Sequence, residues 1–175
     1  MKLSIVMPVY NERETIEEIL RQVMALELEK EIILVDDCST DGTREWLREW
    51  GGDGVRVLYH ERNSGKGAAL RTGFAHVTGD VVVPQDADLE YDPQDLIRLM
   101  ELFKRGVADA VYGSRLMGGA PQRVHLFWHK VGNGLLSFLT NLLFNFTLTD
   151  METCYKMVRA DVLRELNLVS NGFSI

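Results

Sequence analysis

The stretch Asp80-Val81-Val82-Val83-Pro84-Gln85-Asp86-Ala87-Asp88 joins a short apolar run to two carboxylates that are one residue apart. The run from Asp80 to Pro84 is typical of a buried β-strand. Carboxylates at the mouth of a buried strand are costly to hold without a counter-charge, which a divalent cation with a phosphate-bearing ligand supplies. The stretch therefore predicts a strand of a central sheet with a metal site at its end. A solvated acidic turn before the next helix is the alternative.

Similar β-branched runs alternate with amphipathic stretches along the chain. Strands are expected at Leu3–Val9, Glu31–Val35, Val55–His60, Asp80–Pro84 and Ala110–Tyr112. Helices are expected at 15–28, around Trp46 and Leu47, from Asn63 onward, and at 93–104, where Asp92 is the N-cap and Pro93 the first helical residue. This alternation predicts an α/β fold: an open, mostly parallel, Rossmann-like sheet flanked by helices and connected by right-handed crossovers.

Composition narrows the class of protein. The chain has 175 residues, of which 46% are hydrophobic and 26% charged, which suits one soluble domain with a full core. The net charge of −7 argues against nucleic acid as a partner. Cys38 and Cys154 stand far apart with no CxxC pair, which indicates neither a disulfide framework nor a zinc site. No signal peptide precedes the first strand. We therefore expect a cytoplasmic protein.

Polar clusters follow three of the predicted strands. They are Pro8–Glu12, Asp36–Ser39 and Asp86–Glu90. In an open α/β sheet, ligands bind outside the carboxyl ends of the strands, at the point where the strand order reverses. These clusters can therefore converge on one crevice.

Carboxylates in two of these clusters have different expected tasks. Asp88 is the best candidate metal ligand, with Glu90 beside it and Asp86 either sharing the cation or orienting its waters. Mg²⁺ and Mn²⁺ prefer such oxygens and keep positions open for substrate phosphates. Asp37 can accept hydrogen bonds from a ribose hydroxyl or a base N–H. Ser39, Thr40 or Asp41 is expected to cap the helix that follows.

Two further segments could contact phosphate. The segment Asn63–Leu70 opens a helix with small residues and a lysine, which favours either backbone N–H contacts to an anion or a tight turn that lets the helix pack closely. Arg115 follows Gly113 and Ser114, where its guanidinium could hold a phosphate by two hydrogen bonds. The alternative for Arg115 is a surface ion pair with Asp86 or Asp88.

The segment Leu126–Phe146 is long, amphipathic and rich in Leu and Phe. Its polar residues and glycines argue against a membrane span. Docking at a membrane surface and packing into the core remain open alternatives, because an apolar stripe suits both.

Together, several motifs resemble the inverting GT-A glycosyltransferases of family 2, and within that family the dolichyl- or polyprenyl-phosphate sugar synthases. They are Pro8-Val9-Tyr10-Asn11-Glu12, Val35 with Asp37, Asn63 with Gly65, Gly67 and Ala68, the D-x-D motif Asp86-Ala87-Asp88, and Gly113-Ser114-Arg115. The resemblance implies one GT-A catalytic domain over 1–175, with a nucleotide-binding part at about 1–116 and an acceptor-side part at about 117–175. Relatives continue further, so we expect a truncated C-terminus.

The resemblance also implies roles for individual residues. Those expected to hold the nucleoside are Pro8, Tyr10, Glu12, Val35 and Asp37. Asp86 and Ala87 would line the ribose and diphosphate, Asp88 and Glu90 would ligate Mg²⁺ or Mn²⁺, and Arg115 would contact phosphate. Asp150, in the segment 149–156, would belong to the acceptor side. Position 90 carries Glu where some relatives have Gln, which keeps or strengthens cation binding.

The implied function is transfer of a sugar from GDP-mannose or UDP-glucose to a polyprenyl or dolichyl phosphate, at the cytoplasmic face of a membrane. The cation would neutralise the departing diphosphate with help from Arg115, so Asp88, Arg115 and Asp150 are the expected catalytic residues. A lipid phosphate needs cationic positioning, for example by Arg123 or Lys130, whereas a saccharide hydroxyl needs a base, for which Asp150 is the candidate.

Other classes of protein fit less well. A dinucleotide-dependent dehydrogenase should have glycines directly after the first strand, where this chain has Pro8–Glu12. A sugar-nucleotide pyrophosphorylase should have a Gly-rich basic loop at the same place. A non-enzymatic module that binds nucleotide sugars or docks on a membrane remains an alternative.

Overall fold

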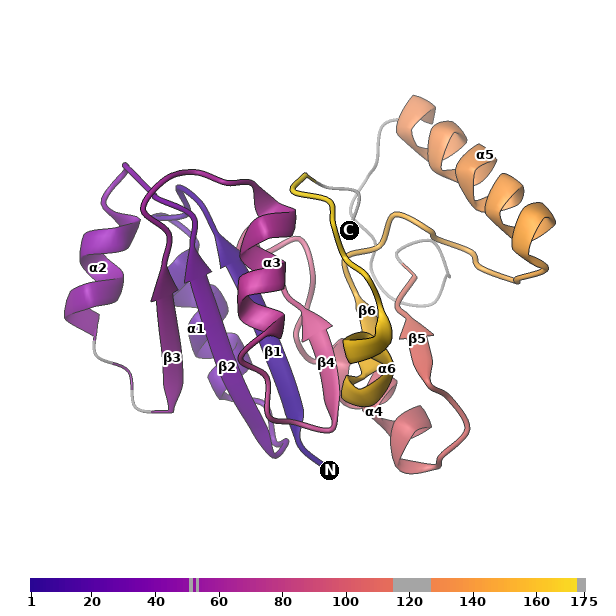
Figure 1. Ribbon diagram of the computed structural model, residues 1–175, viewed down its shortest axis with the longest axis horizontal. Helices are drawn as coiled ribbons and strands as arrows, with labels where there is room; N and C mark the ends of the chain where they lie inside the picture. Colours follow the sequence, from indigo (N-terminus) through magenta and orange to yellow (C-terminus); the bar gives the residue numbers. More distant parts are fainter. Residues whose placement is uncertain (51, 53, 115–126, 173–175) are drawn as a thin grey trace.

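The computed structural model describes residues 1–50, 52, 54–114 and 127–172, with side chains in its long helix from Val131 onward (Figure 1). The elements in chain order are β1 (Leu3–Val9), α1 (Ile16–Met24), β2 (Lys30–Asp36), α2 (Thr43–Trp50), β3 (Val55–Tyr59), α3 (Lys66–Phe74), β4 (Val81–Pro84), α4 (Asp95–Lys104), β5 (Ala110–Tyr112), α5 (Phe127–Phe144), β6 (Lys156–Arg159) and α6 (Ala160–Glu165).

The strands form one six-stranded sheet in the order β3-β2-β1-β4-β6-β5. The pairs β1–β2, β2–β3 and β1–β4 are parallel, while β6 is antiparallel to both β4 and β5. The predicted α/β class and the mostly parallel sheet are therefore confirmed. The five predicted strands agree with the structure to within one residue at each end, but β6 was not predicted.

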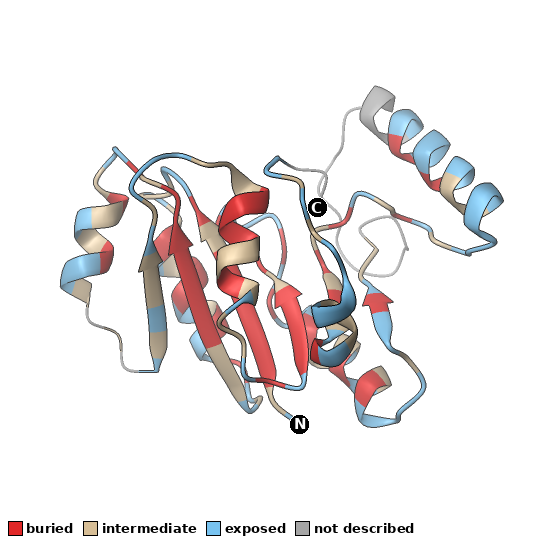
Figure 2. Ribbon diagram, in the orientation of Figure 1, coloured by how far each residue is buried: buried red, intermediate tan, exposed pale blue. Residues whose placement is uncertain are grey.

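Helices cover both faces of the sheet, because successive strand residues point to opposite sides. Ile5 and Met7 belong to a large apolar cluster with α1, α2 and α4. Val6, between them, packs against Leu70 of α3 and Ala160 of α6. Because both faces are covered, the central strands are buried, as Figure 2 shows. The resulting three-layer packing leaves the carboxyl ends of the strands as the edge where polar loops gather.

Two predicted helix boundaries need correction. The first helix ends at Met24 rather than at residue 28, because Leu26 closes a tighter turn by donating its N–H to the carbonyl oxygen of Val23 before β2 begins. The fourth starts at Asp95 rather than at residue 93, after a turn in which Asp92 Oδ1 accepts the N–H of Gln94 at 2.9 Å. Capping of α2 is as expected: Asp41 Oδ1 accepts the N–H of Thr43 at 3.0 Å.

Helix α5 lies apart from the sheet (Figure 1). Asn133 and Ser137 are buried, whereas Phe138 is 60% exposed and Leu142 is 67% exposed. The apolar side chains in the described part of this helix therefore do not pack into the core. Among the described residues, no helix is both long enough and apolar enough to cross a membrane.

Candidate functional site

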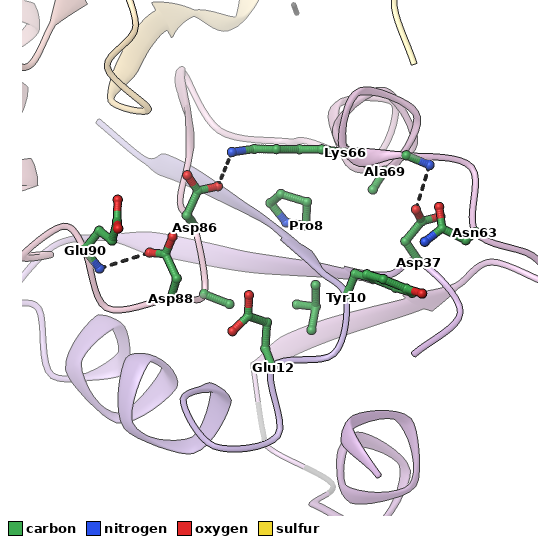
Figure 3. A pocket seen from close by; sticks show the side chains of 13 residues that line it. Pro8, Tyr10, Glu12, Asp37, Asn63, Lys66, Ala69, Asp86, Asp88 and Glu90 are labelled. Carbon is green, nitrogen blue, oxygen red and sulfur yellow. Dashed lines mark hydrogen bonds and ion pairs between the residues drawn. The ribbon is translucent and has the colours of Figure 1, made fainter. Parts of the chain in front are cut away.

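A pocket of about 550 Å³ opens at the carboxyl ends of β1, β2 and β4 (Figure 3). The strand order reverses beside β1, since β2 lies on one side of it and β4 on the other. The lining residues come from the end of β1, from the loops after β1, β2, β3 and β4, and from the start of α3. They are Pro8, Val9, Tyr10, Glu12, Asp37, Asn63, Gly65, Lys66, Ala69, Asp86, Ala87, Asp88 and Glu90. The three polar clusters thus meet at one edge of the sheet.

The charge of this pocket is strongly unbalanced. Its described lining carries five carboxylates, those of Glu12, Asp37, Asp86, Asp88 and Glu90, and one cationic side chain, that of Lys66. Lys66 Nζ lies 2.6 Å from Asp86 Oδ1. Although burial favours a neutral amine, the Asp86 carboxylate keeps the pKa of Lys66 above its ordinary value.

Two carboxylates of the pocket, those of Asp88 and Glu12, have raised pKa values. Burial raises the pKa of Asp88, and the charges of Asp86 and Glu90 raise it further. Burial likewise raises the pKa of Glu12, with Asp88 and Asp86 adding to the shift. Both shifts come from burial first and from the neighbouring negative charges second, and a bound cation would offset these charges.

The donor set fits a hard divalent cation. Asp88 and Glu90 present oxygen ligands on one short loop, in which Asp88 Oδ1 also accepts the N–H of Glu90 at 3.0 Å. Within the described ranges, no group of three or more His, Cys, Asp or Glu side chains stands ready as a complete metal cage. Mg²⁺ and Mn²⁺ do not require one, because one or two carboxylates plus substrate phosphates and waters suffice.

Asp37 is buried and fastens the loop before α3. Its oxygens accept the N–H of Ser64 at 2.9 Å, the N–H of Gly65 at 2.7 Å and a contact from His60 Nδ1 at 2.7 Å. His60 Nε2 lies 2.9 Å from Thr72 Oγ1 in α3. Sequence reasoning did not single out His60. The only signal in the sequence was its position as the last residue of the predicted strand Val55–His60.

The amides at the start of α3 have partners within the chain. Ser64 and Gly65 donate to Asp37, and Gly67 donates to the carbonyl oxygen of Asn171 at 2.9 Å. A Cβ at Gly67 would lie 2.5 Å from the carbonyl oxygen of Ser170. The structure thus favours the tight-turn alternative for this segment, and Lys66 is its charged side chain in the pocket lining.

Each of the loops after β1, β2 and β4 holds one non-glycine residue in the left-handed region. These residues are Asn11 with φ 57°, Cys38 with φ 66° and Leu89 with φ 60°. Such backbone costs on the order of 1–3 kcal/mol per residue and persists where the surrounding structure enforces it. Strain of this kind gathers at binding sites, in agreement with the placement of the pocket.

Some expected site residues lie elsewhere. Val35 is fully buried and packs with Ile33 and Ala69 on the face that α3 covers, so it does not line the pocket. Asp150 is 1% exposed and does not line it either. Arg115 and Arg123 lie outside the described residues, as does the side chain of Lys130.

Asp150 belongs instead to the attachment of α5. Its Oδ1 accepts Asn133 Nδ2 at 2.7 Å. Ser137 Oγ accepts the N–H of Met151 at 3.1 Å, and Asn141 exchanges two hydrogen bonds with the main chain of Leu148 at 2.8 Å each. Polar contacts to the segment 148–151 therefore hold α5, and its apolar side chains from Val131 onward are exposed.

Comparison with known proteins agrees with this architecture. The model of glycosyl transferase family 2 matches residues 4–166. The undecaprenyl-phosphate 4-deoxy-4-formamido-L-arabinose transferase of Sodalis glossinidius is 43% identical over 108 residues, which cover 58% of this chain and 33% of that protein. The dolichol-phosphate mannosyltransferase of Pyrococcus furiosus is 37% identical over 134 residues, which cover 75% of this chain and 38% of that protein. The chain thus spans little more than a third of these relatives.

A solved structure shares the fold. The mannosyltransferase PcManGT of Pyrobaculum calidifontis, in complex with GDP-Man and Mn²⁺, superposes with a TM-score of 0.70 at 21% identity. The match covers 97% of this chain and 47% of that one. The expected GT-A arrangement is therefore confirmed at the level of the fold.

Proposed function

We propose that this chain, which belongs to glycosyl transferase family 2, forms the donor-binding part of a metal-dependent hexosyltransferase that acts on a polyprenyl or dolichyl phosphate. One observation carries the proposal: Glu12, Asp86 and Asp88 meet Lys66 in one pocket at the strand-order reversal (Figure 3). The two curated relatives, both named as polyprenyl-phosphate sugar transferases, support the acceptor class.

The donor would be a nucleotide sugar. Tyr10 is 46% exposed while lining the pocket, so its ring offers a stacking surface for a base. Pro8 and Ala87 would border the nucleoside and ribose. Lys66 would contact the diphosphate, and Asp88 with Glu90 would hold the Mg²⁺ or Mn²⁺. When bound, the cation neutralises negative charge on the leaving diphosphate. GDP-mannose and UDP-glucose are the donors we propose.

The acceptor would be a lipid phosphate rather than a saccharide hydroxyl. A phosphate monoester is largely ionised near neutral pH, with a second pKa of about 6, so it needs no base. A hydroxyl would need one, yet Asp150 is buried and bonded to Asn133. The exposed apolar side of α5 supports a peripheral position on a membrane surface, which we assign to the cytoplasmic face.

Displacement at the anomeric carbon would then be direct, with inversion. In this division of labour, about 1–116 binds the donor and about 117–175 faces the acceptor. Arg115 and Arg123 are the arginines we propose for phosphate contacts, with Lys130 as a third basic group.

Two measurements test the proposal. Calorimetry with UDP and GDP, each with and without Mn²⁺, should show metal-dependent binding of one nucleotide. The natural full-length protein should then move a labelled sugar to polyprenyl phosphate and not to an oligosaccharide. Transfer to the oligosaccharide alone would refute the lipid acceptor. Metal-dependent binding without transfer or donor hydrolysis would favour a non-enzymatic nucleotide-sugar-binding module.

A further inference from the structure

We propose that Gln85 and Tyr155 form a positioning pair that sets the geometry of the carboxylate loop, defined as Asp86–Glu90. Gln85 is 0% exposed and Tyr155 is 2% exposed. Tyr155 Oη donates to Gln85 Oε1 at 2.7 Å, across 70 residues of sequence. The importance of this loop rests on the function proposed above, in which it holds the cation.

Gln85 connects this buried hydrogen bond to the loop itself. Its side-chain Nε2 donates to the carbonyl oxygen of Asp86 at 3.0 Å, while its main-chain N–H donates to the carbonyl oxygen of Val6 in β1 at 2.9 Å. The first peptide of the carboxylate loop is therefore held from the sheet and from the Gln85 side chain at once. A shift of Gln85 would turn the Asp86 carbonyl and the residues after it.

Tyr155 is itself held in place. Its carbonyl oxygen accepts the N–H of Gly113 at 2.8 Å, and its ring packs against that of Tyr91 with centroids 4.7 Å apart. Tyr91, which directly follows the carboxylate loop, accepts the N–H of Cys154 on its hydroxyl at 2.8 Å. The segment Cys154–Tyr155 thus contacts the residues before and after the loop.

The loop needs such anchors for two reasons. It carries three carboxylates that repel one another, and it contains Leu89 in the left-handed region. An apolar pair could fill the space of Gln85 and Tyr155 without a buried polar group. A fully satisfied buried hydrogen bond instead specifies one arrangement, because its partners are costly to separate in the core. The pair therefore holds a crowded loop in the form that binds a cation.

The test compares three variants with the wild type. Tyr155→Phe removes the hydroxyl, and the double variant Gln85→Met with Tyr155→Phe replaces the whole hydrogen bond by apolar groups of similar size. Tyr112→Phe is the matched control, because Tyr112 lies on neighbouring β5 and is 39% exposed. Three quantities are measured: thermal unfolding, hydrogen exchange of the peptide 85–91 without ligand, and Mn²⁺-dependent binding of UDP or GDP by calorimetry.

We expect Tyr155→Phe to speed exchange in the peptide 85–91 and to weaken Mn²⁺-dependent nucleotide binding about tenfold, as is usual for residues behind metal ligands. Tyr112→Phe should change neither quantity. The double variant should melt above the single one, since no Gln85 Oε1 is left in the core without its donor. Its affinity should stay low, because the Asp86 carbonyl oxygen has lost the Gln85 Nε2 donor as well. If Tyr155→Phe does not fold, the double variant still tests the positioning role through its exchange rates and its nucleotide affinity.

Unchanged exchange and unchanged affinity in Tyr155→Phe and the double variant would overturn the positioning role. Recovered affinity in the double variant would do the same, because packing alone would then suffice. If the wild type binds neither nucleotide with Mn²⁺, the proposed function fails, and the exchange rates alone decide whether the pair anchors the loop.

Discussion

Lys66 Nζ lies 2.6 Å from Asp86 Oδ1, which joins the first residue of α3 to the loop after β4. The ammonium is thereby placed among the carboxylates before any ligand arrives. Because Asp86 is engaged by this ion pair, Asp88 and Glu90 are the more accessible oxygen ligands on the loop. An incoming diphosphate would find the ammonium beside the proposed cation site.

Replacing Lys66 by Met should weaken the binding of UDP or GDP in the presence of Mn²⁺ by at least about tenfold, since a hydrogen bond to a charged group is lost. Calorimetry measures the effect. Lys104→Met is the control, because Lys104 pairs with Glu101 on α4 and does not line the pocket. Equal affinity in both variants would exclude a diphosphate contact by Lys66.

Asp88→Asn should reduce Mn²⁺ affinity by about 100-fold. Replacing a residue that only supports a metal ligand typically costs about 10- to 100-fold, and loss of a ligand itself should cost at least the upper value. Electron paramagnetic resonance of free Mn²⁺ in the presence of UDP or GDP reports the change. Asp109→Asn serves as control, because Asp109 is exposed and away from the pocket. A similar Mn²⁺ affinity in Asp88→Asn and the wild type would move the cation site elsewhere.

The same Asp88→Asn variant should be more stable than the wild type without ligand at pH 7. The pKa of Asp88 is raised in the folded chain, so the folded state binds its proton more tightly than the unfolded state does. The carboxylate therefore destabilises the fold above its unfolded pKa, close to the ordinary 3.8, and the penalty is complete above the raised folded pKa.

Thermal unfolding at several pH values checks the sign of this effect. The difference in melting temperature between Asp88→Asn and the wild type should be largest near neutral pH and should vanish below pH 3.8. A melting temperature that is lower in the variant at pH 7 would contradict the predicted strain.

Much of this arrangement follows from local patterns in the sequence. The apolar runs ending at Val9, Val35 and Pro84 mark strands by their composition, and the topology of parallel sheets then brings their carboxyl ends together. Strand β6 is not predicted from the sequence, because Lys156–Arg159 is four residues long and its partners β4 and β5 are distant in sequence. Nothing local marks such a pairing.

Other differences arise from long-range contacts. Val35 was assigned to the nucleoside by resemblance, but the alternation along β2 points it toward α3. The apolar period of α5 predicted a helix without saying which side faces solvent. That choice depends on the segment 148–151, whose polar groups bind Asn133, Ser137 and Asn141. The ion pair of Lys66 likewise depends on the approach of α3 to β4.

Gly67→Ala should destabilise the fold by about 1–3 kcal/mol, the usual cost of overpacking, because its Cβ would collide with main-chain atoms of Ser170 to Gly172. Limited proteolysis should also release the segment 166–172 more readily. Gly132→Ala is the control: it lies in α5 with nothing within 4 Å of its added Cβ. That variant should be neutral or slightly stabilised by its higher helix propensity. Equal melting temperatures for Gly67→Ala and the wild type would contradict the packing.

Placing charges on the exposed side of α5 should abolish membrane association. We expect Phe138→Asp with Leu142→Asp to remove binding to vesicles of phosphatidylcholine and phosphatidylglycerol in a sedimentation assay, since both side chains are exposed. Nucleotide binding should be unchanged. Leu166→Asp is the control, because Leu166 is 50% exposed but follows α6. Retained vesicle binding in the double variant would assign any membrane contact to another surface.

The way α5 is attached has a consequence for how such chains diversify. Its outward side chains contribute nothing to the packing of the sheet, so substitutions there leave the donor edge intact. That helix surface can therefore vary between related chains while the pocket stays the same. The residues of the loops after β1, β2 and β4 that line the pocket have no such freedom, because a change in any of them alters the shared pocket.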